Sequence, residues 1–172
     1  MHGASFPPVQ GACRSDTVAQ VRVSIRNATR VDVPSVMTLW EEAAENDARP
    51  ADSARSVETL LARDSQALFI AEMDGRIVGS VIAGWDGWRA HLYRLAVHPD
   101  ARRRGVGGQL LVAATERLTD LGATRLDAMV LESNDLGQSI WRSEGFASQK
   151  EWRRWVRPIQ ADSSVRDLTP QP

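Results

Sequence analysis

The spacing of apolar and polar residues changes several times along this chain, and each change predicts a new structural element. Residues 21–26 alternate apolar and polar side chains, which is typical of a half-buried strand. Residues 33–40 carry apolar side chains at helical spacing, with Pro34 tolerated in the first turn and Asp32 predicted as the helix cap. A second apolar stripe over residues 54–62 predicts another helix.

A predicted meander of strands follows these two helices. Two apolar runs, residues 67–73 and 77–83, flank an Asp-Gly pair at 74–75. Such a pair predicts a hairpin, because the tight turn needs residues that accept positive φ. A further turn at 84–87 leads into a third run at 91–97. Three consecutive strands joined by short turns predict an antiparallel meander.

The spacing of apolar residues becomes helical again after the meander. Apolar residues repeat at helical spacing over 106–118, and Gly122 is predicted to end that helix. Residues 125–131 predict another strand, 136–143 a short helix and 146–156 a last strand. A strand-helix-strand crossover after a meander predicts a mixed sheet of the α+β class.

Composition sets limits on the kind of protein. The chain has 172 residues, 42% of them hydrophobic and 25% charged, as expected of one globular domain. We expect this domain at 21–158, between disordered tails at 1–20 and 159–172 that are rich in small and polar residues. A net charge of −1 gives no reason to expect a nucleic-acid partner. We also expect no membrane span and a cytoplasmic location, since long apolar runs are absent and Cys13 is the only cysteine.

A basic loop between the third strand of the meander and the long helix is the main candidate for chemistry. Arg102, Arg103 and Arg104 come before Gly105 and Gly107. The first N–H groups of a helix have no partner within the helix, and the helix dipole favours a negative group beside them. Glycines allow the backbone to approach phosphate oxygens closely. The loop therefore predicts a site for a phosphorylated ligand.

Two common phosphate-binding loops do not match this segment. A P-loop needs Lys and then Ser or Thr after its last glycine, but Gly108 is followed by Gln109 and Leu110. The dinucleotide fingerprint requires its third glycine where Leu110 stands, and it follows the first strand of a parallel sheet. The loop belongs to neither class.

Residues 102–107 resemble the acetyl-CoA signature Arg/Gln-x-x-Gly-x-Gly/Ala of the GNAT superfamily of N-acetyltransferases. Residues 92–99 resemble that family's fourth strand and its exit, and residues 134–146 its fourth helix and closing Gly-Phe. The resemblance covers about residues 21–158 and includes the order of the elements. It implies a small, bacterial-type, single-domain GNAT fold, in which the crossover after the meander opens to hold acetyl-CoA.

The resemblance also implies how the donor is bound. The backbone of the fourth strand would hold the pantetheine arm, and an N–H group near Ala96 would stabilise the oxyanion of the thioester. The N–H groups of the basic loop and helix start would hold the pyrophosphate. The residues so implied are Leu95, Ala96, Val97, Arg102, Arg103, Arg104, Gly105, Val106, Gly107, Gly108, Asn134 and Trp141. No metal is expected.

The catalytic groups are less clearly indicated. Trp141 stands where many family members have a tyrosine that protonates the departing thiolate, and an indole N–H cannot release a proton. His91 and Tyr93 share one face of the strand, and the position of His91 matches catalytic glutamate or histidine residues of several members. We predict His91 as the base, because imidazole accepts protons near neutral pH, and Tyr93 as a candidate acid. The alternative is that His91 is a strand residue satisfied by a neighbour.

The function implied is acetyl transfer from acetyl-CoA to a primary amine by direct attack in a ternary complex. A covalent acetyl-enzyme is not expected, since no cysteine stands near the predicted site. The acceptor amine is left open between a small molecule and a protein, and a homodimer is allowed. The alternative is a non-catalytic acyl-CoA-binding or sensor module, which Trp141 favours.

Overall fold

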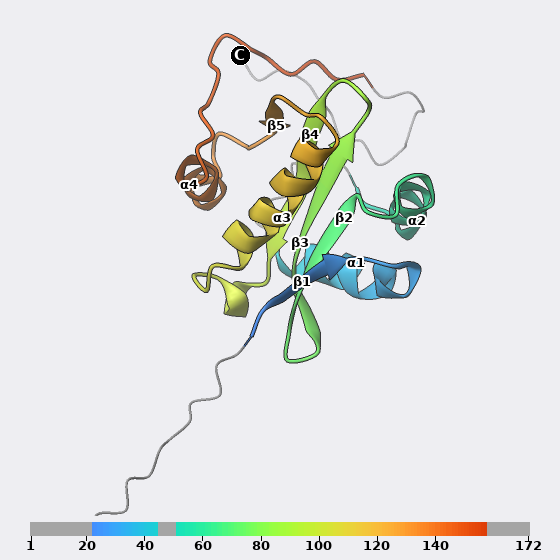
Figure 1. Cartoon of the computed structure of the whole chain (residues 1–172). Helices are drawn as coiled ribbons and strands as arrows, with labels where there is room; N and C mark the ends of the chain where they lie inside the picture. Colours follow the sequence, from blue (N-terminus) through green and yellow to red (C-terminus); the bar gives the residue numbers. More distant parts are fainter. Residues whose placement is uncertain (1–21, 45–50, 158–172) are drawn as a thin grey trace, which may run out of the picture.

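A computed structural model of the chain describes residues 22–44 and 51–157 (Figure 1). The tails predicted at 1–20 and 159–172, and Cys13, lie outside the described residues. The elements, in chain order, are β1 (Ser24–Asn27), the 3-10 turn η1 (Arg30–Asp32), α1 (Val33–Glu42), α2 (Ala54–Arg63), β2 (Leu68–Met73), β3 (Arg76–Trp85), β4 (Ala90–Val97), the 3-10 turn η2 (Pro99–Ala101), α3 (Val106–Asp120), β5 (Leu126–Ala128) and α4 (Asp135–Ser143).

The strands form one mixed sheet in the order β1-β2-β3-β4-β5. The first four strands pair antiparallel, whereas β5 runs parallel to β4 after the crossover through α3. The hairpin between β2 and β3 turns at Asp74 and Gly75, whose φ angles are 52° and 75°. The predicted α+β class, meander and hairpin are confirmed.

Helices cover both faces of the sheet, and each face has its own core (Figure 1). Apolar residues of α3, together with Trp141 of α4, pack on one face, and those of α1 and α2 pack on the other. At Gly79 of β3 a Cβ atom would lie 2.9 Å from both Leu110 Cδ1 and Val106 Cγ1. The missing side chain therefore lets the start of α3 lie directly against the sheet.

Both helices of the second half end in the same way. Gly122 after α3 and Gly145 after α4 have positive φ, at 93° and 84°. At each end the glycine N–H and the next N–H bond back to the last turn, which is the Schellman motif. The prediction that Gly122 ends α3 is confirmed, and the Gly-Phe pair at 145–146 is a helix stop.

The prediction of a strand at 146–156 is wrong, because residues 146–157 form no strand in the structure. A strand is stabilised by ladder bonds and by burial of one face, and this segment has neither. It pairs with no strand within residues 22–44 and 51–157, and Trp152 and Trp155 are 71% and 93% exposed. The strand predicted at 125–131 is also shorter than expected, with only Leu126–Ala128 paired.

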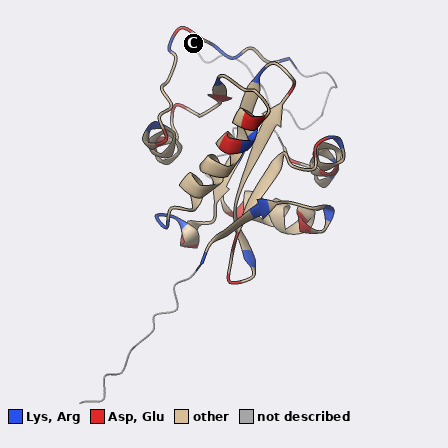
Figure 2. Ribbon diagram, viewed as in Figure 1, with Lys and Arg blue, Asp and Glu red and all other residues tan. Residues whose placement is uncertain are grey.

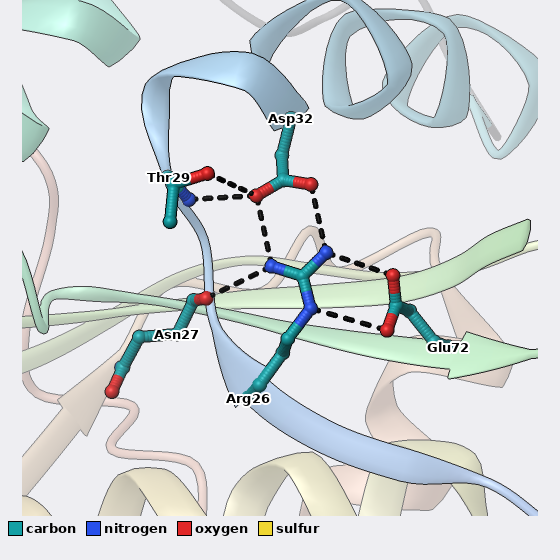
Figure 3. A network of polar contacts seen from close by, with 5 residues as sticks. All are labelled: Arg26, Asn27, Thr29, Asp32 and Glu72. Carbon is teal, nitrogen blue, oxygen red and sulfur yellow. Dashed lines mark hydrogen bonds and ion pairs between the residues drawn. The ribbon is translucent and has the colours of Figure 1, made fainter. Parts of the chain in front are cut away.

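Asp32 stands at the helix N-terminus, as predicted, but its carboxylate does not cap α1. Figure 3 shows that Arg26 donates to both oxygens of Asp32 at 2.8 Å and also binds Glu72. The N–H and hydroxyl of Thr29 donate to Asp32 as well, at 2.7 and 2.8 Å. These bonds hold the pKa of Asp32 and of Glu72 below their ordinary values. The network ties β1 to β2 and to the start of α1.

Candidate active site

Strand β4 contains a bulge next to the predicted catalytic residues. Ser80 of β3 pairs with Ala96 and Ile82 pairs with Tyr93, so two residues of β4 lie opposite a single residue of β3. Arg94, in the bulge, has a φ of 49°, in the left-handed region that side chains seldom adopt. The extra residue shifts the alternation of side chains, so Leu95 packs on the α3 face while Arg94 stacks over Trp40 on the α1 face.

Strands β4 and β5 separate just before this bulge. The parallel ladder between β4 and β5 ends at the pair formed by Leu92 and Ala128. Beyond it, β4 residues 92–97 and residues 129–132 form opposite walls of a cavity of about 940 Å³. α4 contributes Ile140 and Trp141 to the same cavity. A strand edge that faces a cavity offers main-chain N–H and C=O groups to an extended ligand.

The start of α3 lies at one end of this cavity. Gly105 precedes the helix with a φ of 76°, and no side chain of the described residues caps that N-terminus. A Cβ at Gly107 would lie 2.3 Å from Ile140 Cδ1, and a Cβ at Gly108 would lie 3.1 Å from Glu144 Oε1. The first turn of α3 therefore presents its N–H groups and positive dipole end to the cavity, close against α4.

The three arginines before α3 have different surroundings. Figure 2 shows this basic loop at the N-terminal end of α3. Arg103 lines the cavity and has a φ of 59°. Arg102 also lines it, but its Nε donates to the carbonyl of Val97 at 3.2 Å. Arg104 is not among the residues that line the cavity and lies 3.7 Å from the sulfur of Met73.

The other end of the cavity is formed around Tyr93. The ring of Tyr93 lies 5.8 Å from that of His91, and a Cβ at Gly84 would lie 3.2 Å from Tyr93 Cε2. His91 is half-buried and pairs with Gly84 on one side and with Asp127 on the other. Tyr93 lines the cavity, whereas His91 does not. Glycine at position 84 thus leaves room for the tyrosine ring over the sheet.

Tyr93 also has the clearest electrostatic signature in this region. Partial burial raises the pKa of its phenol, and the carboxylate of Asp86 raises it further, while Arg154 opposes the change. A raised pKa means that the phenol keeps its proton at neutral pH. Tyr93 can therefore donate a proton or a hydrogen bond into the cavity.

Asn134 and Trp141 line the cavity and also stabilise α4. The side-chain oxygen of Asn134 accepts a hydrogen bond from Gly137 N–H at 2.7 Å and so caps the helix. Trp141 is only 8% exposed, and its ring meets Phe146 edge to face at 4.8 Å. The tryptophan is thus a core residue with one edge towards the cavity.

The structure brings together all the predicted site residues except His91 and Arg104, which do not line the cavity. Sequence reasoning missed Arg94 and Arg154, which line the cavity beside Tyr93, and the buried Ser80, which contacts the bulge. The available signal for Ser80 was a hydroxyl in the middle of an apolar strand, because a buried polar group needs a partner. Arg154 gave no such signal, since it lies far away in the sequence.

The described residues contain no candidate membrane span and no candidate metal site. None of their helices is long and apolar enough to cross a membrane. No group of three or more of their His, Cys, Asp and Glu side chains is arranged to hold a metal ion.

Comparison with known proteins defines the class. The sequence model of the acetyltransferase (GNAT) family matches residues 33–146. An acetyltransferase of Yersinia enterocolitica is 38% identical over 128 residues, which cover 74% of this chain and 89% of the relative. Solved structures of acetyltransferases share the fold, and two serve as examples. An aminoglycoside N-acetyltransferase in complex with CoA has a TM-score of 0.64 at 20% identity, covering 81% of this chain and 97% of that one.

The ribosomal-protein-S18-alanine N-acetyltransferase from Escherichia coli has a TM-score of 0.60 at 24% identity, covering 74% of this chain and 79% of that one. The chain therefore belongs to the GNAT acetyltransferase family, as the resemblance of residues 102–107 predicted. It is an N-acetyltransferase, an enzyme of the acyl-CoA-dependent class.

Proposed function

We propose that this enzyme transfers an acetyl group from acetyl-CoA to a primary amine by direct attack in a ternary complex. The observation that carries the proposal is a single cavity of about 940 Å³ that joins the start of α3, the unpaired edge of β4 and Tyr93. Donor and acceptor can meet in such a cavity without an acetyl group first being stored on the protein.

The residues at the α3 end fit the donor. The left-handed turn at Gly105 and the uncapped helix start offer N–H groups to a pyrophosphate, and Arg103 adds positive charge. Among the described residues, the β4 edge from Leu95 to Val97 has no strand partner on the cavity side, and it would pair with the pantetheine arm. The amide nitrogen of Asn134 and the edge of Trp141 would contact the arm from α4. Acetyl-CoA supplies an activated thioester.

The residues at the Tyr93 end supply the proton transfers. The Ala96 region donates a main-chain N–H to the thioester carbonyl oxygen and stabilises the charge it gains as the amine nitrogen attacks. His91 does not line the cavity, so it would accept the proton that the amine loses through an intervening water. Tyr93 gives its phenolic proton to the departing sulfur, which takes the electron pair of the broken C–S bond. In this assignment Tyr93 replaces the acid that is missing at Trp141.

The acceptor approaches from the α1 face of the sheet, because Tyr93 and Arg94 both project to that side of β4. Two structural neighbours support an amine acceptor, since they are by name N-acetyltransferases of an aminoglycoside and of a ribosomal-protein alanine. The same scaffold thus accommodates both small-molecule and protein amines in other enzymes.

A thiol-release assay with a panel of primary amines and amine-bearing peptides tests the proposal. We expect CoA release that depends on the amine, with one acetylated amine formed for each CoA, and no release with the same compounds acetylated beforehand. Initial rates should give intersecting double-reciprocal lines. Parallel lines, or acetyl-CoA binding without release with any amine, would contradict the proposal, the latter favouring a non-catalytic module.

A further inference from the structure

Ser80 carries a fully buried hydroxyl in the middle of β3, where its exposure is 0%. Its Oγ accepts a hydrogen bond from the indole Nε1 of Trp40 at 2.8 Å and donates one to the carbonyl of Arg94 at 3.1 Å. An indole N–H is only a donor, so Ser80 must be the acceptor of the first bond. The serine proton is therefore directed at the Arg94 carbonyl.

The residue so contacted is the strained one in the β4 bulge. A residue with a side chain is strained in the left-handed region, and it stays there only where its surroundings hold it. Ser80 holds the main-chain carbonyl of Arg94. The guanidinium of Arg94 pairs with Asp52 and lies 5.6 Å from the ring centroid of Trp40. Trp40 thus supports Arg94 twice, once through Ser80 and once by its ring.

Holding this carbonyl also sets the direction of the next N–H group. In a trans peptide the C=O and the N–H point to opposite sides. The Arg94 carbonyl points to Ser80 on the β3 side. The N–H of Leu95 consequently points away from β3, to the side of β4 where the cavity lies.

We propose that Ser80 and Trp40 are positioning residues for acetyl transfer, which aim the main-chain N–H groups of the β4 bulge at the thioester carbonyl. This inference rests on the proposed function, because only an acetyl thioester in the cavity gives those N–H groups a developing negative charge to stabilise. It adds Ser80 of β3 and Trp40 of α1, neither of which lines the cavity.

The test compares Ser80→Ala and Trp40→Phe with Leu61→Ala, a destabilising change on α2, which contributes no residue to the cavity. Loss of an oriented oxyanion donor costs about 100-fold or more in kcat, and partial misalignment costs less. We expect Ser80→Ala to lower kcat about 10- to 100-fold and Trp40→Phe about 3- to 10-fold. The KM for acetyl-CoA should change less than threefold. Leu61→Ala should lower the melting temperature but keep kcat within twofold.

A second readout does not depend on turnover. Amide hydrogen exchange with and without acetyl-CoA should show protection at Leu95 in the wild type. Ser80→Ala should lose that protection while protection at residues 106–108 remains. Wild-type kcat in Ser80→Ala, or equal protection of Leu95 in both proteins, would overturn the inference. Absence of amine-dependent turnover in the wild type would instead overturn the proposed function, and the exchange result would still decide the role of Ser80.

Discussion

The two ends of the cavity are built from different parts of the chain. At the α3 end one continuous stretch, residues 95–108, supplies a strand edge, a loop and a helix start, and the groups offered to the ligand are main-chain N–H groups. At the other end Tyr93 and Arg94 of β4 contribute side chains together with Arg154, which lies far away in the sequence. Under the proposed function, backbone shape would govern binding of the donor, whereas side-chain identity would govern the acceptor end.

The largest effect is expected at the acceptor end. Replacing His91 by Ala removes the proposed base and should lower kcat about 100- to 1000-fold, the lower part of the usual range for general base catalysis. The affinity for acetyl-CoA, measured by calorimetry, should stay within twofold. Tyr93→Phe should lower kcat by a smaller factor with the same unchanged affinity. An equal loss of affinity and kcat would show that the two ends are not separate.

At the donor end Gly107→Ala should weaken acetyl-CoA binding roughly 100-fold, because its Cβ would lie 2.3 Å from Ile140 Cδ1 and force α4 away from α3. The added methyl faces α4, so the double variant with Ile140→Ala should recover affinity to within about tenfold of the single Ile140→Ala variant. Failure of the second change to restore binding would mean that the ligand itself needs the space at position 107. Isothermal titration calorimetry measures the acetyl-CoA affinity of the single and double variants.

Gly105→Ala should weaken acetyl-CoA binding about tenfold, since the residue has a φ of 76° and a side chain there costs roughly 1–2 kcal/mol. Gly122→Ala is the matched control, with a φ of 93°, no neighbouring atom within 4 Å of the added Cβ and a place away from the cavity. Both variants should lose similar stability in urea unfolding. If Gly122→Ala also weakened binding, loop shape would not be the cause.

The smallest effect on either end is expected from the Arg26 network, which contributes no residue to the cavity. The depressed pKa values of Asp32 and Glu72 mean that the unfolded chain binds protons more readily than the folded one. Their stabilising contribution is therefore complete above about pH 4–4.5 and is lost as the pH falls below it. The melting temperature of the wild type should be constant from pH 7 to 5 and should fall below pH 4.

Arg26→Met should destabilise the protein by about 2–3 kcal/mol at pH 7, because it removes the cation that pairs with Asp32, a carboxylate only 7% exposed. The cost is below that of a fully buried pair, since the Arg26 side chain is 39% exposed. Acid sensitivity should become shallower, and kcat and acetyl-CoA affinity at pH 7 should not change. A steep loss of affinity in this variant would contradict the separation of fold and site.

The same contrast explains what the sequence could predict. The proposed donor end could be predicted because its glycines, basic residues and helix start are contiguous in the sequence, and the spacing of residues indicates local structure. The acceptor end depends on which strands pair and where the register shifts. Nothing in the run around Arg94 signals a bulge, because the shift arises from contacts with Ser80 on another strand and with Trp40 on a helix.

The last segment shows the limit of pattern reasoning. Residues 146–156 contain aromatic and apolar residues of strand type, but the pattern does not say whether a partner strand exists. In the structure they leave both tryptophans of the segment, Trp152 and Trp155, exposed. Asp32 is a similar case, because the preference for Asp at a helix start cannot show that Arg26 and Thr29 bind its carboxylate instead.

Amide hydrogen exchange upon titration with acetyl-CoA tests the central claim most directly, because it reports on main-chain N–H groups residue by residue. We predict new protection concentrated at residues 95–97 and 105–108, with little change at His91 or in residues 126–128. Protection confined to other segments, or binding that leaves the amides of 95–97 and 105–108 unprotected, would contradict a donor site made of backbone.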